Sequence, residues 1–135
     1  MTISKYISEF IALYSDIKID TNHIQDGADK YGLFKSPSRQ ISKNIDGTAI
    51  ITESYQFFAK EASISETERK ESDEFLEDFT YFVDEFGIIY EYPSIDKNRR
   101  ITDITVSGCP TPFSDEDKQI LYQISLSITY EKEIQ

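Results

Sequence analysis

The chain has 135 residues, so we expect one domain spanning residues 1–135, and its 39% hydrophobic content with 13% aromatic side chains excludes intrinsic disorder. Its 25 acidic against 14 basic side chains give a net charge of −11, which argues against a protein that binds nucleic acid by neutralising phosphates. One cysteine and one histidine exclude an intrachain disulfide and a Cys/His zinc site, and no apolar run approaches the ~20 residues that cross a membrane.

The first predicted element is a helix over residues 3–14. Its apolar side chains recur at the spacing of one helical face, namely Ile3, Ile7, Phe10, Ile11 and Tyr14. Thr2 is a suitable N-cap because its hydroxyl can accept a hydrogen bond from an unpaired backbone N–H, and Ser15-Asp16 is a suitable end. The N-terminus has no basic segment followed by an apolar stretch, so we expect no secretory signal.

Alternation of apolar and polar side chains predicts several strands after this helix. Pro37 interrupts one apolar run because proline cannot donate a hydrogen bond to a strand ladder. Asp46-Gly47 predicts a two-residue hairpin turn whose central positions both have positive φ. The strands are predicted over Ile17–Ile24, Tyr31–Phe34, Ile41–Ile45 and Thr48–Phe58, the last two forming the hairpin.

A second helix begins at Ser65, which forms a capping box with Glu68, and ends at Gly87 as the left-handed C-terminal residue. We expect its apolar side chains to face the core: Phe75, Leu76, Phe79, Phe82, Val83 and Phe86. We expect its acidic side chains to face outward: Glu71, Asp73, Glu74, Glu77, Asp78, Asp84 and Glu85.

The rest of the chain is predicted to be mainly strand. Ile88–Tyr92 is a short strand, a basic loop and the strand Ile101–Ser107 follow, and residues 108–112 form a rigid turn. The last strand, Ile120–Tyr130, alternates over eleven residues. We therefore expect an α+β fold, with an antiparallel or mixed sheet of four or five strands and two helices packed on one face.

No constellation in the sequence supports catalysis, a cofactor or a metal site. His23 has no assigned acid or nucleophile beside it, and Cys109 has no basic neighbour to lower its pKa, so both are interpreted as structural or solvated residues. The glycines are isolated and form no phosphate-binding loop. We therefore expect a protein that is not an enzyme.

The last strand has two interpretations. No proline or charge lies inside it to protect an edge, so it either presents its backbone to a neighbouring subunit or lies centrally in the sheet. On the first interpretation its apolar side chains are candidate assembly contacts, namely Tyr122, Ile124, Leu126 and Ile128.

Two basic patches are further candidate assembly contacts on an otherwise acidic chain. Lys35 with Arg39 forms one, and Lys97 with Arg99 and Arg100 forms the other. Both are predicted to lie in loops, where interaction residues are common. They either serve as solvated surface charges or bind the acidic faces of neighbouring subunits.

Four segments together resemble the small tail terminator proteins, also described as neck, minor capsid or tail completion proteins, of tailed phages and phage-derived contractile particles of clostridia. These segments are ISKYISEFIALY, TAIITESYQFF, EFLEDFTYFVDEFG and QILYQISLSITYEK. The resemblance lies in element order and length over nearly the whole chain, without a catalytic motif, so no functional residue is carried over.

The resemblance implies a structural protein of a virion or phage-like particle, assembled in the bacterial cytoplasm. Such a protein forms a ring, usually a hexamer, which caps the head-proximal end of the tail tube and ends tube and sheath assembly. Its partners would be copies of itself, the tail tube and sheath proteins and the neck connector, with DNA at most passing through the lumen and no membrane. Alternatives are a head–tail connector protein, an acidic DNA-mimic inhibitor and, last, a small enzyme.

Overall fold

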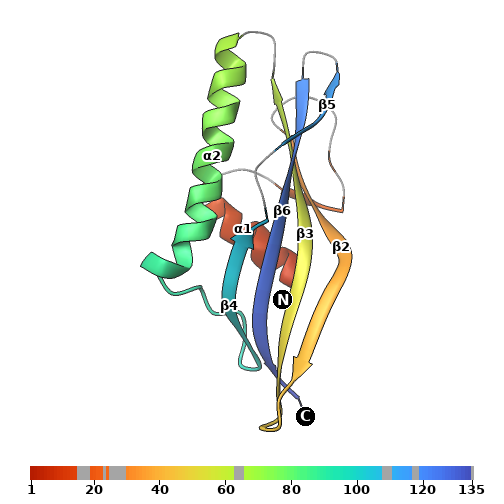
Figure 1. The fold of residues 1–135 in the computed structure, drawn as a ribbon, viewed down its shortest axis with the longest axis vertical. Helices are drawn as coiled ribbons and strands as arrows, with labels where there is room; N and C mark the ends of the chain where they lie inside the picture. The colour runs from red at the N-terminus through yellow and green to blue at the C-terminus, as the bar shows by residue number, and fades with distance from the viewer. Residues whose placement is uncertain are drawn as a thin grey trace.

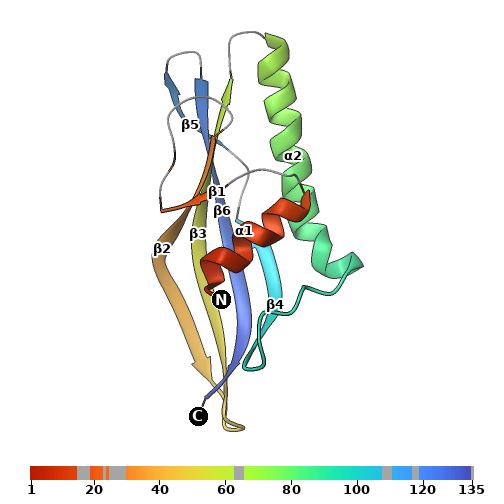
Figure 2. The ribbon, with the colours of Figure 1, turned by 180° about the vertical axis from the view of Figure 1, so that it is seen from behind.

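The computed structural model describes residues 1–14, 19–22, 24, 30–62, 66–107, 111–116 and 119–134. A mixed sheet carries two helices on one of its faces, as the views from opposite sides in Figure 1 and Figure 2 show. The predicted α+β fold is therefore confirmed. The elements in chain order are α1 (Ile3–Tyr14), β1 (Ile19–Thr21), β2 (Lys30–Lys43), β3 (Thr48–Ala62), α2 (Glu66–Ile89), β4 (Arg99–Val106), β5 (Thr111–Glu116) and β6 (Gln119–Glu133).

Over the described residues the sheet has six strands, with the order β1-β2-β3-β6-β4, and β5 also pairs with β6. β1 runs parallel to β2, and all other neighbours are antiparallel, so the sheet is mixed. Strand β5 was not predicted, because its sequence TPFSDE lacks the alternation that marks a half-buried strand. The predicted turn over residues 108–112 is wrong at Thr111 and Pro112, which belong to β5, and the rest of it lies outside the described residues.

β6 is a central strand, which corrects the interpretation that its edge is open to a neighbouring subunit. It pairs with β3 over its whole length on one side. On its other side it pairs with β5 through Gln119–Gln123 and with β4 through Leu126–Lys132. A strand paired on both sides needs no protecting charge or proline, which explains why the sequence contains none between Ile120 and Tyr130.

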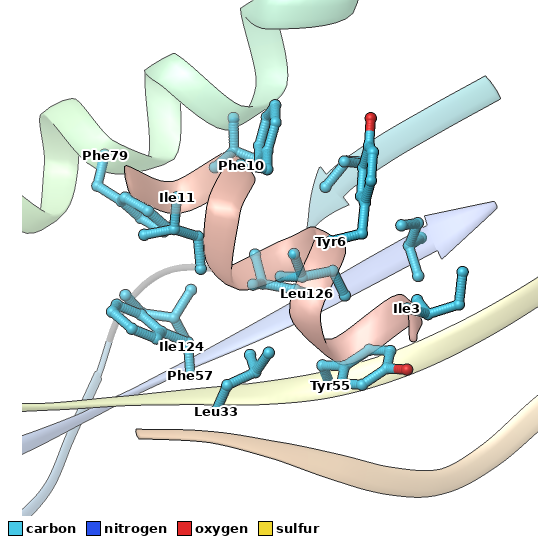
Figure 3. Close-up of a cluster of buried hydrophobic side chains, with 14 of the residues drawn as sticks. Ile3, Tyr6, Phe10, Ile11, Leu33, Tyr55, Phe57, Phe79, Ile124 and Leu126 are labelled. Atoms are coloured by element: carbon cyan, nitrogen blue, oxygen red, sulfur yellow. The ribbon is translucent and has the colours of Figure 1, made fainter. Parts of the chain in front are cut away.

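The core lies between the two helices and one face of the sheet. The odd-numbered residues of β3 from Ala49 to Glu61 and the even-numbered residues of β6 from Ile120 to Tyr130 are all buried, as period two requires. Figure 3 shows Phe57 and Ile124 from the sheet directed toward Ile11 of α1 and Phe79 of α2. The rings of Phe57 and Phe79 stack with centroids 5.4 Å apart. Both helices thus pack on the same face, as predicted.

The first helix follows its prediction closely. The hydroxyl of Thr2 accepts a hydrogen bond from the backbone N–H of Lys5 at 3.1 Å, which confirms the N-cap. The buried residues include Tyr6, whose phenol donates to the carbonyl of Pro93 at 2.7 Å. The phenol of Tyr14 donates to the carbonyl of Phe75 at 3.1 Å, so it joins the two helices. The predicted end at Ser15-Asp16 lies outside the described residues.

The β2–β3 hairpin differs from its prediction in two respects. The two short strands predicted on either side of Pro37 are one strand, β2, whose register shifts between Lys35 and Arg39. The missing N–H of proline is tolerated there because an irregularity already interrupts the ladder. In the turn, Gly47 alone has positive φ (88°), and the N–H of Asn44 donates to the carbonyl of Thr48 at 2.8 Å. The loop therefore has three residues instead of two.

Helix α2 extends past its predicted end. It continues through Gly87 to Ile89, so the predicted C-terminal glycine and the short strand over Ile88–Tyr92 are both wrong. Gly87 has a different role: a Cβ atom there would lie 2.5 Å from the Oη atom of Tyr92. The glycine lets the tyrosine ring lie against the helix. The predicted N-cap, Ser65, lies outside the described residues.

Candidate assembly surfaces

The first basic patch faces a buried carboxylate. Lys35 and Arg39 lie on strand β2 and not in a loop, and Arg39 is the ladder partner of Glu53 on β3. The Nζ atom of Lys35 is 3.8 Å from Oε1 of Glu53, whose side chain is only 7% exposed. The phenols of Tyr55 and Tyr130 donate to the two oxygens of the same carboxylate, at 2.9 and 2.6 Å. The structure thus gives Lys35 a partner within its own chain.

The phenols of Tyr55 and Tyr130 are kept protonated beside the Glu53 carboxylate. Burial first, and then the hydrogen bond to the Glu53 carboxylate, raises the pKa of Tyr130 to about 12. The same two causes raise the pKa of Tyr55. A neutral phenol donates a hydrogen bond to the carboxylate, whereas a phenolate beside it would be repelled. The cluster thus satisfies a buried charge and joins β2, β3 and β6 under the N-terminus of α1.

The second basic patch is largely engaged within the chain as well. Arg99 and Arg100 are the first residues of β4 and not loop residues. The guanidinium of Arg99 donates from Nε and Nη2 to Oδ2 of Asp96, at 2.9 and 2.7 Å, and only 19% of its side chain is exposed. Arg100 pairs with Glu131 of β6 at 2.9 Å. Lys97 is exposed, and together with both arginines it lines an open cleft of about 630 Å³ between the end of α2 and the start of β4.

The four candidate residues of β6 point into the core of their own subunit. Ile124 and Ile128 are completely buried, and Leu126 and Tyr122 are 2% and 7% exposed. All four are paired with β3 on one side, and on the other side Tyr122 is paired with β5 and Leu126 and Ile128 with β4. They therefore lie at no surface of the folded chain. The alternation of apolar and polar residues in β6 arises because every second side chain is buried in the core.

The acidic side of α2 is exposed, as predicted. Its apolar stripe is buried at Leu76, Phe79 and Val83 and partly buried at Phe75, Phe82 and Phe86. The exposed carboxylates form rows along the outside of the helix: Glu71, Asp73, Glu74, Glu77, Asp78, Asp84 and Glu85. This side of α2 is a strongly negative surface.

The outer edge of β4 is closed by side chains. The backbone N–H of Ile104 donates to Oη of Tyr92, and the N–H of Val106 donates to Oδ1 of Asp84, both at 3.1 Å. These contacts occupy donors that a further strand would need. In the described part of the chain, the edge of β2 beyond Lys35 has no strand partner, and there Pro37 and the register shift oppose strand addition. Strand addition at these two edges is therefore disfavoured.

Large apolar side chains are exposed at the tip of the β2–β3 hairpin. We call residues 39–50 the arm; it reaches beyond the lower ends of both helices in Figure 1. Ile45 at the turn is fully exposed, and Ile41 and Ile50 behind it are 45% and 37% exposed. Ile134 is also exposed, and its N–H donates to the carbonyl of Gly47 at 2.7 Å. Ile134, which directly follows β6, thus places a further exposed isoleucine beside the turn.

A second exposed apolar surface lies where α2 ends. We call Ile88, Ile89 and Tyr90 the helix end; they are 84%, 63% and 62% exposed. Sequence periodicity predicts neither surface, because it places Ile41, Ile45 and the helix-end residues in ordinary strands. Their exposure depends on how far the hairpin and the helix extend past the core, which periodicity does not determine.

Compared with protein-family models and with curated proteins, the sequence gives no significant match. Neither helix has both the length and the apolarity needed to cross a membrane, as far as the described residues extend. Within those ranges, no group of three or more His, Cys, Asp or Glu side chains is arranged to hold a metal ion. His23 and Cys109 lie outside the described residues. The most informative features of the surface are therefore the arm, the helix end and the acidic side of α2.

Proposed function

We propose that the protein is a structural subunit of a phage-type tail, which acts as a tail terminator at the head-proximal end of the tube. In this role it assembles with further copies of itself into a ring and contacts the tube, sheath and neck proteins. The observation that carries the proposal is the arm, which holds Ile41, Ile45 and Ile50 in water beyond the core. An isolated subunit gains nothing from this exposure, whereas an assembly would bury it.

The energetic argument concerns how much apolar surface remains uncovered. Burying an isoleucine side chain stabilises an assembly by about 1.5–3 kcal/mol relative to leaving it in water. Scattered exposed apolar residues are normal, but contiguous groups mark interaction sites. Here exposed isoleucines occupy the turn (Ile45) and the two opposite faces of the hairpin behind it (Ile41, which pairs with Ile51, and Ile50), and three large apolar residues follow one another at the helix end. Both groups are suited to contacts between subunits.

The acidic side of α2 also fits this role. A negatively charged wall repels the phosphates of DNA and lets a genome pass without adhering. The exposed carboxylates of α2 would provide such a wall if the helix faces the lumen of a ring. This proposal requires no catalytic group, cofactor or metal.

Electron microscopy of particles produced without the protein tests the proposal. Loss of a terminator should give tails of irregular or excessive length, because nothing stops tube polymerisation. A head–tail connector, the nearest alternative, would instead leave tails of normal length that fail to join heads. Particles that keep uniform tails and intact head–tail joints would contradict both assignments.

A further inference from the structure

The face of the sheet opposite the helices, which we call the outer face, has no charge over its central part. Because alternate residues of a strand point to opposite faces, the even-numbered residues of β3 and the odd-numbered residues of β6 lie on it. Helix α1 lies behind the sheet in Figure 1, so the outer face is turned toward the viewer there. Although 29% of the chain is charged, none of these outward residues is charged from Ile50 to Phe58 of β3 or from Leu121 to Thr129 of β6.

The charged residues of the outer face lie at its margins. Lys60 is at one end of the face, and Glu131 with its partner Arg100 is at the other. Asp103, the ladder partner of Thr129, lies on the edge strand β4. A centre without charge inside a polar and charged rim is the arrangement found at contacts between proteins.

The outer face is large enough for a stable contact. Strands β2, β3, β6 and β4 contain 14, 15, 15 and 8 residues. With a rise of about 3.3 Å per residue and a spacing of about 4.8 Å between strands, they cover about 800 Å². A stable interface of standard size buries about 800 Å² on each partner.

The side chains at the centre of the outer face suit a second copy of the same face. The hydroxyls of Thr52 and Thr129 are hydrogen-bonded at 3.0 Å. Oε1 of Gln56 accepts from Nε2 of Gln123 at 2.8 Å and from Oγ of Ser125 at 3.0 Å. Hydroxyl and amide groups both donate and accept, whereas a carboxylate only accepts and an ammonium only donates. The face is therefore complementary to itself, while a charged partner would lose its solvation there without meeting an opposite charge.

The position of the acidic side of α2 also favours contact through the outer face. Copies of a chain with a net charge of −11 repel one another. Stacked sheets lie about 10 Å apart, and a helix about 10 Å in diameter lies behind each of them. Contact through the outer faces thus keeps the two acidic surfaces about 30 Å apart, well beyond the Debye length of about 8 Å at 0.15 M salt.

We propose that two copies of the chain associate through their outer faces, with the two sheets stacked and related by a twofold axis. The same surface serves on both copies, so the contact is isologous and closes at two copies. It is separate from the contacts that would close a ring around a tail tube, and it does not rest on the proposed function.

Sedimentation velocity of the full chain over a range of concentrations tests this contact. We expect a concentration-dependent dimer. Ser127→Lys should raise its dissociation constant at least about tenfold, because the twofold axis places two like charges in the centre of the interface. The matched control, Ser94→Lys, adds the same charge at an exposed loop position and should not weaken the dimer. Circular dichroism checks that the variants fold, and Ser54→Lys, at the ladder partner of Ser127, replaces Ser127→Lys if that variant does not.

Salt dependence gives a second measurement. Raising the salt from 0.1 M to 1 M should not weaken the dimer, because no charge pair holds its centre and the repulsion between the two chains is screened. A monomer at all concentrations would overturn the proposal, as would an oligomer of any size that Ser127→Lys leaves intact or that dissociates at high salt. Each of these results leaves the tail function to be decided by the particles produced without the protein.

Discussion

Replacing Phe79 by alanine tests whether α2 packs on the sheet as described. The side chain is completely buried, with its ring 5.4 Å from that of Phe57 and 5.6 Å from that of Tyr14. Alanine removes contacts with both the sheet and α1 and leaves a cavity that the neighbouring rings cannot fill. A change of this kind costs about 3–5 kcal/mol, a large part of the 5–15 kcal/mol that stabilises a typical domain.

Urea denaturation followed by circular dichroism measures this change in the free energy of unfolding. With an unfolding entropy of about 2.1 cal/mol/K per residue, the same loss lowers Tm by about 11–18 °C. The control is Glu74→Gln on the exposed side of the same helix, which should change stability by no more than about 0.5 kcal/mol. Equal effects from the two substitutions would refute the assigned orientation of α2.

Three further substitutions test other parts of the account. Gly87→Ala should destabilise the protein, because the added Cβ would meet the phenol of Tyr92, which is held by its hydrogen bond to Ile104. This effect should outweigh the advantage of about 1 kcal/mol that alanine has over glycine in a helix. A higher stability in urea denaturation would contradict this contact. Tyr130→Phe should flatten the alkaline loss of stability. The pKa of Tyr130 is about 12 in the folded protein and about 10 in the unfolded chain. This difference contributes stability that is fully present below pH 10 and is lost as the pH rises through 12. An unchanged pH profile of the urea midpoint would argue against the Glu53 cluster. Ser125→Pro should prevent folding of the isolated chain, because β6 is paired on both sides; a folded monomer by circular dichroism would contradict the central position.

The sequence predicted those elements in which the order of apolar and polar residues reflects one buried face. The stripe in α2 and the long alternation in β6 each have one buried face, and both were placed correctly. The sequence did not decide whether β6 lies at an edge, because a strand shows the same alternation whether one or both of its backbone sides are paired. The end of α2 was misplaced because Gly87 serves the approach of Tyr92 and not a left-handed turn.

The basic patches show why candidate sites are harder to predict than elements. The ammonium of Lys35 comes near the Glu53 carboxylate only after β2 pairs with β3, and Tyr130 contacts the same carboxylate although it is 77 positions away along the chain. Arg99 is held by Asp96, three residues earlier, in a turn that the sequence interpretation treated as a free loop. Charge in a sequence identifies ionic side chains but not their partners, which long-range pairing supplies.

Locating the protein in assembled particles tests whether it is a tail terminator. A short C-terminal tag would be detected by gold labelling under the electron microscope, since Ile134 lies beside the exposed arm. If the protein is a tail terminator, we expect label at one position in each particle, the head-proximal end of the tail tube. Label along the whole tail, or particles that contain none of the protein, would contradict it.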